Sequence, residues 1–214
     1  MRDAFHDDLD AISVSLVEMS QLANTAMVRA TKAILEADLA IAEEVISEDE
    51  RIDNLHHDLD ARTLTLLARQ QPVAGDLRTI VTSIRMSSDI ERMGDLAHHI
   101  AKVARLRHPN TAIPADLLLA FTEMGHVAEK LSTKVATVIT TRDTDMALQV
   151  EKDDDEMDEL HKKVIIGITN GGAGITIESA IDLTLLGRYY ERFADHAVAV
   201  ARRVYFLVKG EFPQ

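Results

Sequence analysis

Cysteine and tryptophan are absent from this chain of 214 residues, and proline, glycine and aromatic residues are scarce. Without cysteine the chain has neither a disulfide framework nor a thiolate metal site, and the absence suits a reducing compartment. The 4 prolines, 9 glycines and 4% aromatic residues leave few turn and strand formers, whereas residues that favour helices are plentiful. We therefore predict an all-α fold.

A long apolar run is also missing. No uninterrupted apolar stretch approaches the roughly 18 residues that a membrane span needs. The first ten residues, MRDAFHDDLD, are acidic where a signal peptide would be basic and then apolar. Both features predict a cytoplasmic protein.

Positive charge is in deficit, with 23 Lys and Arg against 36 Asp and Glu, a formal net charge of −13 at pH 7. This charge opposes long-range attraction to nucleic acids and anionic bilayers and favours cations or basic partner surfaces. We expect no nucleic-acid partner. Nucleophilic catalysis has little support either, because the chain lacks a nucleophile-elbow motif and TNGGAG (169–174) lacks the Lys and Ser/Thr of a phosphate-binding loop.

Breaker residues divide the chain into six long stretches with helical character. The stronger breaks are QQPVAGD (70–76), RHPNTAIPAD (107–116) and TNGGAGIT (169–176), and the weaker ones are TTRDTD (140–145) and the region of Ala37 and Asp38. The middle break leaves two halves of similar length. We predict two tandem three-helix bundles, residues 1–108 and 109–214, in one rod-like unit.

Two motifs recur in the same order in both halves, as an internal duplication would produce. ERMGD (91–95) corresponds to ERFAD (191–195), and EDERIDNLHHDL (48–59) corresponds to DDDEMDELHKKV (153–164). Each of these motifs carries a pair of acidic residues four positions apart. Such residues share one face of a helix, with about 40° between them and Cβ atoms roughly 6 Å apart.

The paired carboxylates are predicted to face outward from the bundle seams and, where the second and third helices of each half pack antiparallel, to converge across a groove. Four like charges in one place are unfavourable unless cations compensate them, and carboxylate oxygens suit Mg²⁺, Mn²⁺, Ca²⁺ or bridged iron. We predict one metal site in each half. The ligands would be Asp49, Asp53, Glu91 and Asp95 in the first half and Asp154, Asp158, Glu191 and Asp195 in the second.

Two alternatives stay open for these residues. The carboxylates would also suit a metal-free helical scaffold whose acidic faces are solvated or meet a basic partner. A carboxylate-bridged di-iron bundle, an oxidase or an iron store, is built from inward Glu and Glu-x-x-His pairs. One such pair is present, EMGH from Glu123 to His126, but the sequence has no second.

The segments QPVAGDLRTIVTSIRMSSDIERMGDLA (71–97) and AIDLTLLGRYYERFADHAV (180–198) resemble the signature segments of the PhoU family, and the sequence looks like the actinobacterial branch. The resemblance covers nearly the whole chain. It implies a cytoplasmic, mostly dimeric and non-catalytic protein that couples the phosphate ABC transporter to a sensor histidine kinase. It would dock on the transporter's ATPase subunit, reach the membrane only through its partners, and keep the phosphate regulon repressed when phosphate is plentiful.

The resemblance also implies multinuclear clusters of iron or zinc on the same eight carboxylates, and manganese or magnesium would suit them as well. The halves differ after the last Asp of the motif, where the first has Leu96 and the second has His196. Gln71, Asp76 and Arg78 have no counterpart in the second half and are candidates for a partner contact, although Asp76 also suits a helix start on its own. No phosphate-binding motif is evident, so we expect phosphate to be sensed indirectly, through the transporter.

Overall fold

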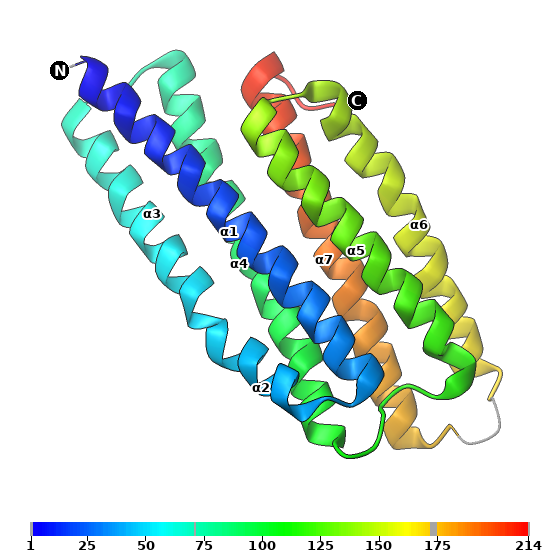
Figure 1. The fold of residues 1–214 in the computed structure, drawn as a ribbon. Helices are drawn as coiled ribbons and strands as arrows, with labels where there is room; N and C mark the ends of the chain where they lie inside the picture. Colours follow the sequence, from blue (N-terminus) through cyan, green and yellow to red (C-terminus); the bar gives the residue numbers. More distant parts are fainter. Residues whose placement is uncertain (1, 71, 172–174, 214) are drawn as a thin grey trace.

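The computed structural model describes residues 2–70, 72–171 and 175–213, and all regular secondary structure in these ranges is helical. The prediction of an all-α fold is confirmed. The helices are α1 (Arg2–Glu36), α2 (Leu39–Glu48), α3 (Glu50–Gln70), α4 (Ala74–Arg107), α5 (Ala115–Thr141), α6 (Thr144–Thr169) and α7 (Ile177–Lys209) (Figure 1).

The second of the six predicted helices is divided into α2 and α3, which only Asp49 separates. The backbone of Asp49 stays helical, with φ −57° and ψ −41°, and its carbonyl still accepts a hydrogen bond from the Ile52 N–H at 3.0 Å. The two segments therefore follow one another closely, and the plan of six long helices holds with one interruption.

The two weaker breaks in the sequence are real helix ends. At the first, Ala37 has φ +54°, and the side chain of Asp38 caps α2 by accepting a hydrogen bond from the Ile41 N–H. At the second, Arg142 has φ +56°, and Asp143 caps α6. Residues in the left-handed region cannot continue an α-helix, and Asp is among the preferred N-cap residues, so both breaks are fixed locally.

Four helices make up the centre of the molecule, α1, α4, α5 and α7, and the others lie at its two edges (Figure 1). The segments α2 and α3 pack on α1 and α4, whereas α6 packs on α5 and α7. Each half of the chain thus supplies two long central helices and one outer helical stretch. The acidic motifs lie where an outer helix meets a central one.

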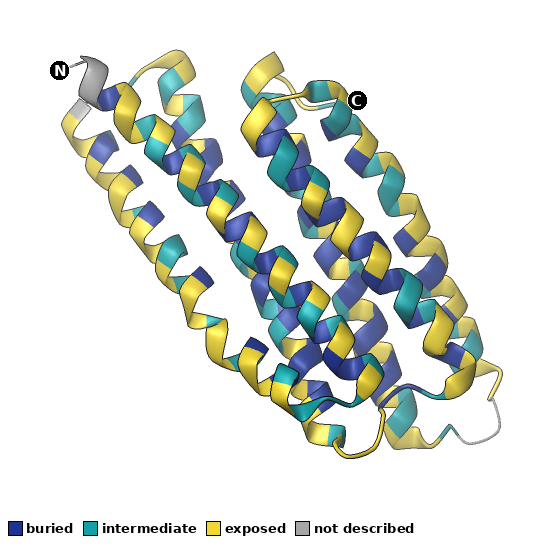
Figure 2. Ribbon diagram, in the orientation of Figure 1, coloured by how far each residue is buried: buried dark blue, intermediate teal, exposed yellow. Residues whose placement is uncertain are grey.

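Buried residues follow the inward faces of all the helices and form one continuous apolar core (Figure 2). Its largest fully buried side chains include Tyr190, Phe121 and Phe193. The Tyr190 hydroxyl and the Thr31 hydroxyl are 2.8 Å apart, so the buried polar atom of the tyrosine has a partner on α1. None of the helices in the described ranges is both long and apolar enough to cross a membrane.

Candidate functional site

The first set of acidic residues lies between the α2–α3 stretch and α4. Asp49 and Asp53 face Glu91 and Asp95 across a close helix contact at Gly94. A Cβ atom at Gly94 would lie 2.8 Å from Ile52 Cδ1, and Asp49 Oδ1 is 3.8 Å from the same position. The missing side chain lets the two helices approach closely enough for their carboxylates to interact.

The carboxylates of this set repel one another. Burial raises the pKa of Asp53 first, and the negative charges of Asp49 and Asp95 raise it further. Burial likewise raises the pKa of Glu91, with Asp95 as the next cause. The four carboxylates thus form a region of shared negative charge, and their role as metal ligands stays a prediction.

The second set, on α6 and α7, shows the same effect more strongly. Burial and the neighbouring carboxylates of Asp158, Asp195 and Glu191, in that order, raise the pKa of Asp154 to about 7. Burial and then Asp195 also raise the pKa of Glu191. These four carboxylates lie near enough to raise one another's pKa, and a cation between them would relieve the repulsion.

One carboxylate of each set also forms an ion pair with an arginine of its own helix. The Arg92 guanidinium donates to Asp95 at 2.6 Å, and Arg188 pairs with Glu191 in the second half. Across the described parts of the chain, no three His, Asp or Glu side chains stand close enough together to hold one metal ion. The donor chemistry fits a hard cation, and Arg92 and Arg188 would compete with it for Asp95 and Glu191.

Histidines border both sets of carboxylates. The Nδ1 atom of His98 pairs with Asp49, while its Nε2 atom is buried with no hydrogen-bond partner. His56 Nδ1 lies 3.1 Å from the Ser87 hydroxyl. In the second half, His161 approaches Gly187, where an added Cβ atom would lie 3.2 Å from its ring. The repeated Asp-x-x-His spacing at His56 and His161 is the sequence signal that could have placed these histidines beside the acidic motifs.

Asp89 is a charged residue that the sequence analysis did not single out. Its carboxylate accepts a hydrogen bond from Arg203 Nε at 2.7 Å, and its other oxygen lies 3.2 Å from His196 Nδ1. Although burial by itself raises the pKa of Asp89, the hydrogen bonds from His196 and Arg203 bring it below the usual value. His196, which follows the second acidic motif, thus serves a contact between α4 and α7.

The three candidate partner-contact residues have different positions. Gln71 lies outside the described residues. Asp76 is in the first turn of α4, where a negative charge suits the helix dipole. The Arg78 guanidinium carbon lies 5.9 Å from the ring centroid of Phe206 at the end of α7. That prediction stays untested, but Arg78 lines a pocket.

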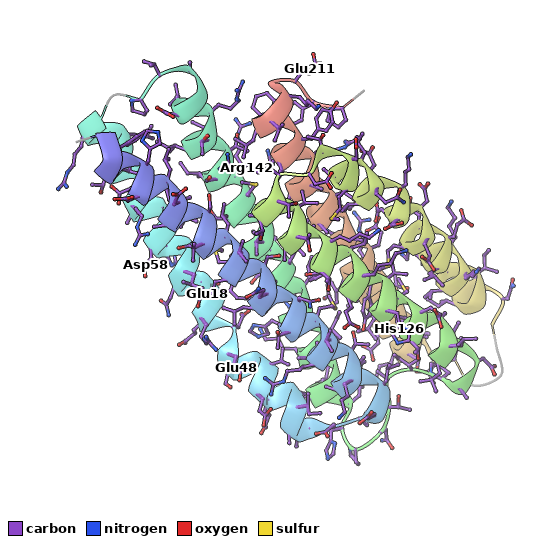
Figure 3. All side chains as sticks on the ribbon, turned by 45° about the horizontal axis from the view of Figure 1, so that its top comes forward. Glu18, Glu48, Asp58, His126, Arg142 and Glu211 are labelled. Carbon is purple, nitrogen blue, oxygen red and sulfur yellow. The ribbon has the colours of Figure 1, made fainter. Side chains whose placement is uncertain are left out.

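The EMGH segment does not point a histidine into the bundle. His126 is exposed on the outer side of α5, where Figure 3 labels it. A di-iron centre of the bundle type needs inward-facing ligands. The arrangement therefore gives no support to an oxidase or iron-storage centre at this position.

Comparison with known sequences identifies the PhoU domain in both halves of the chain, at residues 16–104 and 121–204. The phosphate-specific transport system accessory protein PhoU homolog 2 of Mycobacterium tuberculosis is 48% identical over 213 residues, which cover 100% of both chains. PhoU homolog 1 of Mycobacterium leprae is 47% identical over 214 residues, which cover 100% of this chain and 96% of the relative. These relatives agree with the predicted actinobacterial branch.

Solved structures agree with the sequence comparison. The crystal structure of PhoU from Pseudomonas aeruginosa superposes with a TM-score of 0.88 at 26% identity, covering 97% of this chain and 100% of the other. The phosphate transport system regulatory protein PhoU from Streptococcus pneumoniae has the same fold, with a TM-score of 0.87 at 23% identity over 98% and 99% of the chains. The sequence relatives are named as accessory proteins of phosphate transport, which points to a non-enzymatic protein. The chain belongs to the PhoU family.

Proposed function

We propose that this protein couples the phosphate ABC transporter to a sensor histidine kinase and represses the phosphate regulon when phosphate is plentiful. It acts in the cytoplasm as a homodimer and docks on the transporter's ATPase subunit. The single observation that carries the proposal is full-length identity of 48% with an accessory protein of the phosphate-specific transport system. Docking transmits a signal only when the protein binds one conformational state of each partner more tightly than the other.

A direct test compares a deletion strain of the source bacterium with its parent in phosphate-rich medium. We expect transcription of the transporter genes to rise in the deletion strain and to return to the parental level when the chain is restored. In parallel, the purified chain should bind the ATPase subunit and the cytoplasmic part of the kinase. Unchanged transcription together with no binding to either partner would contradict the proposal.

Metal binding is a second part of the proposal. The ligands are Asp49, Asp53, Glu91 and Asp95 in the first site and Asp154, Asp158, Glu191 and Asp195 in the second. Support comes from the raised pKa values of Asp53 and Asp154, where burial and neighbouring carboxylates outweigh any compensating positive charge. Iron, zinc, manganese or magnesium would supply that charge and would hold the outer helix of each half against its central partner.

Elemental analysis of the untagged protein tests this part. We expect stoichiometric metal in the wild-type protein and its loss when Glu91, Asp95, Glu191 and Asp195 are changed to Ala. A control changes four exposed carboxylates elsewhere to Ala and should keep the metal. The control residues are Glu43, Asp58, Glu159 and Glu211. The metal proposal fails if the wild-type protein stays metal-free after incubation with Mn²⁺, Fe²⁺ and Zn²⁺.

A further inference from the structure

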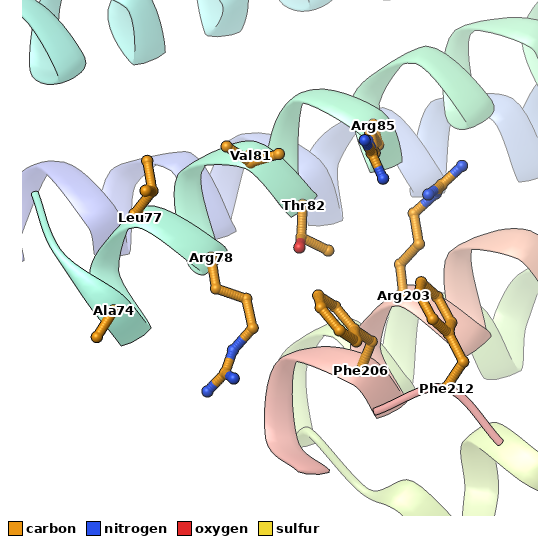
Figure 4. Close-up of a pocket in the computed structure, with 9 residues that line it drawn as sticks. All are labelled: Ala74, Leu77, Arg78, Val81, Thr82, Arg85, Arg203, Phe206 and Phe212. Atoms are coloured by element: carbon orange, nitrogen blue, oxygen red, sulfur yellow. The ribbon is translucent and has the colours of Figure 1, made fainter. Parts of the chain in front are cut away.

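A pocket of about 340 Å³ lies between the start of α4 and the end of α7 (Figure 4). Leu77 and Val81 line it from α4, and Phe206 and Phe212 line it from the other side. The two phenylalanine rings are stacked, with centroids 4.6 Å apart and an interplanar angle of 10°. The stacked rings of Phe206 and Phe212, together with Leu77 and Val81, therefore form an apolar wall of the pocket that is open to solvent.

Three arginine side chains also line this pocket, from both helices (Figure 4). Arg203 is already paired with Asp89. Arg78 rests over the ring of Phe206, and within the described residues neither Arg78 nor Arg85 forms a salt bridge with a carboxylate. The whole chain carries a net charge of −13, whereas the unpaired arginines make this pocket a local region of positive charge.

The same molecule contains a matching junction with the opposite charge. Because α4 and α7 are antiparallel, the end of α4 also meets the start of α7. There Arg107 Nε donates to Asp182 at 2.5 Å, and the Arg107 guanidinium also pairs with Glu178. Two carboxylates that lie one helical turn apart close this second junction.

Pairing each residue with the one 100 positions later, as ERMGD pairs with ERFAD, relates the two junctions. Glu178 then corresponds to Arg78, and Asp182 corresponds to Thr82. The carboxylates that satisfy an arginine at one end are absent from the equivalent positions at the other. Arg107 itself corresponds to Leu207, so the first junction places an arginine where the second places a carboxylate. The second junction shows that a pair of carboxylates one turn apart on a helix binds an arginine of this fold.

We propose that the Arg78–Arg85 pocket docks a helix of a partner protein that presents two carboxylates one turn apart beside apolar side chains. Arginine binds carboxylates with directed, paired hydrogen bonds, and these gain strength beside an apolar wall. This docking surface rests on the proposed function in one respect, because that function requires the protein to bind other proteins.

A helix fits this surface better than a small ion does. Leu77 and Val81 are 41% and 38% exposed and lie four positions apart on one face of α4, and Val73, which is 75% exposed, directly precedes the helix. This stripe continues the apolar wall beyond the pocket, as in the grooves that receive amphipathic helices. The rest of the acidic surface repels an acidic partner, so the pocket fixes where that partner docks.

The probe is a synthetic peptide that copies residues 176–187, TIESAIDLTLLG, the segment that closes the second junction. It is capped at both ends, labelled with a fluorophore and held helical by a side-chain link at the positions of Ala180 and Thr184. These positions are about 200° around the helix from Glu178 and Asp182, so the link leaves the acidic face free. Fluorescence anisotropy measures its binding to the full-length protein.

We expect saturable binding, weakened about tenfold or more in the Arg78→Gln/Arg85→Gln variant. The matched control, Lys102→Gln/Arg105→Gln, removes two exposed positive charges at the far end of α4 and should bind as the wild type does. A peptide with Gln and Asn in place of its Glu and Asp should bind at least about tenfold more weakly. Thermal unfolding of each variant checks that it is folded.

Several outcomes would overturn the inference. Absence of binding would do so, as would equal binding to the Arg78→Gln/Arg85→Gln variant, because the peptide would then sit elsewhere. Displacement by inorganic phosphate or AMP at concentrations equal to that of the peptide would identify a small-anion site instead. None of these results bears on ATPase or kinase binding, so failure of the pocket and failure of the proposed function are distinguishable.

Discussion

Asp154 carries the most strongly perturbed carboxylate among the acidic motifs, with a pKa raised to about 7 by burial and by Asp158, Asp195 and Glu191. In an unfolded chain the pKa returns to about 3.9. The folded state therefore binds a proton more tightly than the unfolded state does. This residue stabilises the fold fully below the unfolded pKa, and the contribution is lost as the pH rises through 7.

We predict that Asp154→Asn increases the free energy of unfolding at pH 8 in metal-free buffer and reduces its fall between pH 4 and pH 8. The expected gain is on the order of 1 kcal/mol, because solvent screens a partly exposed group. Denaturant titrations at several pH values with a chelator present measure it. Asp58→Asn, at an exposed position on α3, is the control. An unchanged pH profile would mean that the carboxylates do not repel one another.

The buried contact between Tyr190 and Thr31 is a second prediction at the scale of single residues. Tyr190→Phe keeps the ring in the core but removes the hydroxyl that meets Thr31 at 2.8 Å. We expect a loss of about 1 kcal/mol in the free energy of unfolding, because the Thr31 hydroxyl loses its buried partner. Urea denaturation measures it, with Tyr205→Phe, at a less buried tyrosine, as the control. A neutral result would indicate that water replaces the bond.

The ends of the helices are decided by short segments. Ala37, Asp38, Arg142 and Asp143 mark helix ends in the structure where the sequence showed only weak breaks. The interruption at Asp49 was not predicted, because Asp49 has helical φ and ψ and shows no breaker signal. Its side chain pairs with His98 on α4, a contact far along the chain that no local pattern reveals.

The start of α6 provides a prediction at the scale of an element. The side chain of Asp143 accepts hydrogen bonds from the N–H groups of Asp145 and Met146, at 2.9 and 3.0 Å. We expect Asp143→Ala to lower the free energy of unfolding by about 1 kcal/mol, whereas Asp143→Asn should be nearly neutral because Asn also caps helices. Hydrogen exchange should locate the change in the first turn of α6. Equal loss in both variants would point to charge rather than capping.

The salt bridge of Arg107 joins two elements at the end of the molecule opposite the pocket. Asp182 is only 7% exposed, and Arg107 donates to both of its carboxylate oxygens. We expect Asp182→Ala to destabilise the protein by about 1–3 kcal/mol, because Arg107 loses its better-buried partner. Glu178→Ala, at the exposed partner, should cost less than about 1 kcal/mol. If Glu178→Ala destabilised the protein more than Asp182→Ala did, burial would not set the strength of this junction.

The excess of negative charge acts on the molecule as a whole. With a net charge of −13 at pH 7, the folded chain repels itself, and salt shortens the range of that repulsion to about 10 Å at 0.1 M. We predict that raising NaCl from about 20 to about 200 mM increases the melting temperature by a few degrees. The increase should vanish at a pH where the net charge is near zero. A salt-independent melting temperature at pH 7 would show that the repulsion is already compensated.

The division of the chain into two repeats stays a prediction at this scale, although the PhoU domain matches once in each half. The apolar core runs without interruption from α1 and α4 to α5 and α7. Each half supplies about the same set of helices, but neither encloses a core of its own. The two halves are therefore expected to unfold together rather than separately.

The sequence by itself determined the all-α class, the positions of the main breaks and the acidic pairs on shared helix faces. These features depend on composition, on breaker residues and on the 3.6-residue period of a helix, all of which are local. Only the tertiary structure decided that Asp49 joins His98, that Asp89 joins Arg203 and His196, and that Arg78 and Arg85 share a pocket. Such contacts depend on which helices become neighbours, and that follows from packing across the whole chain rather than from any one segment.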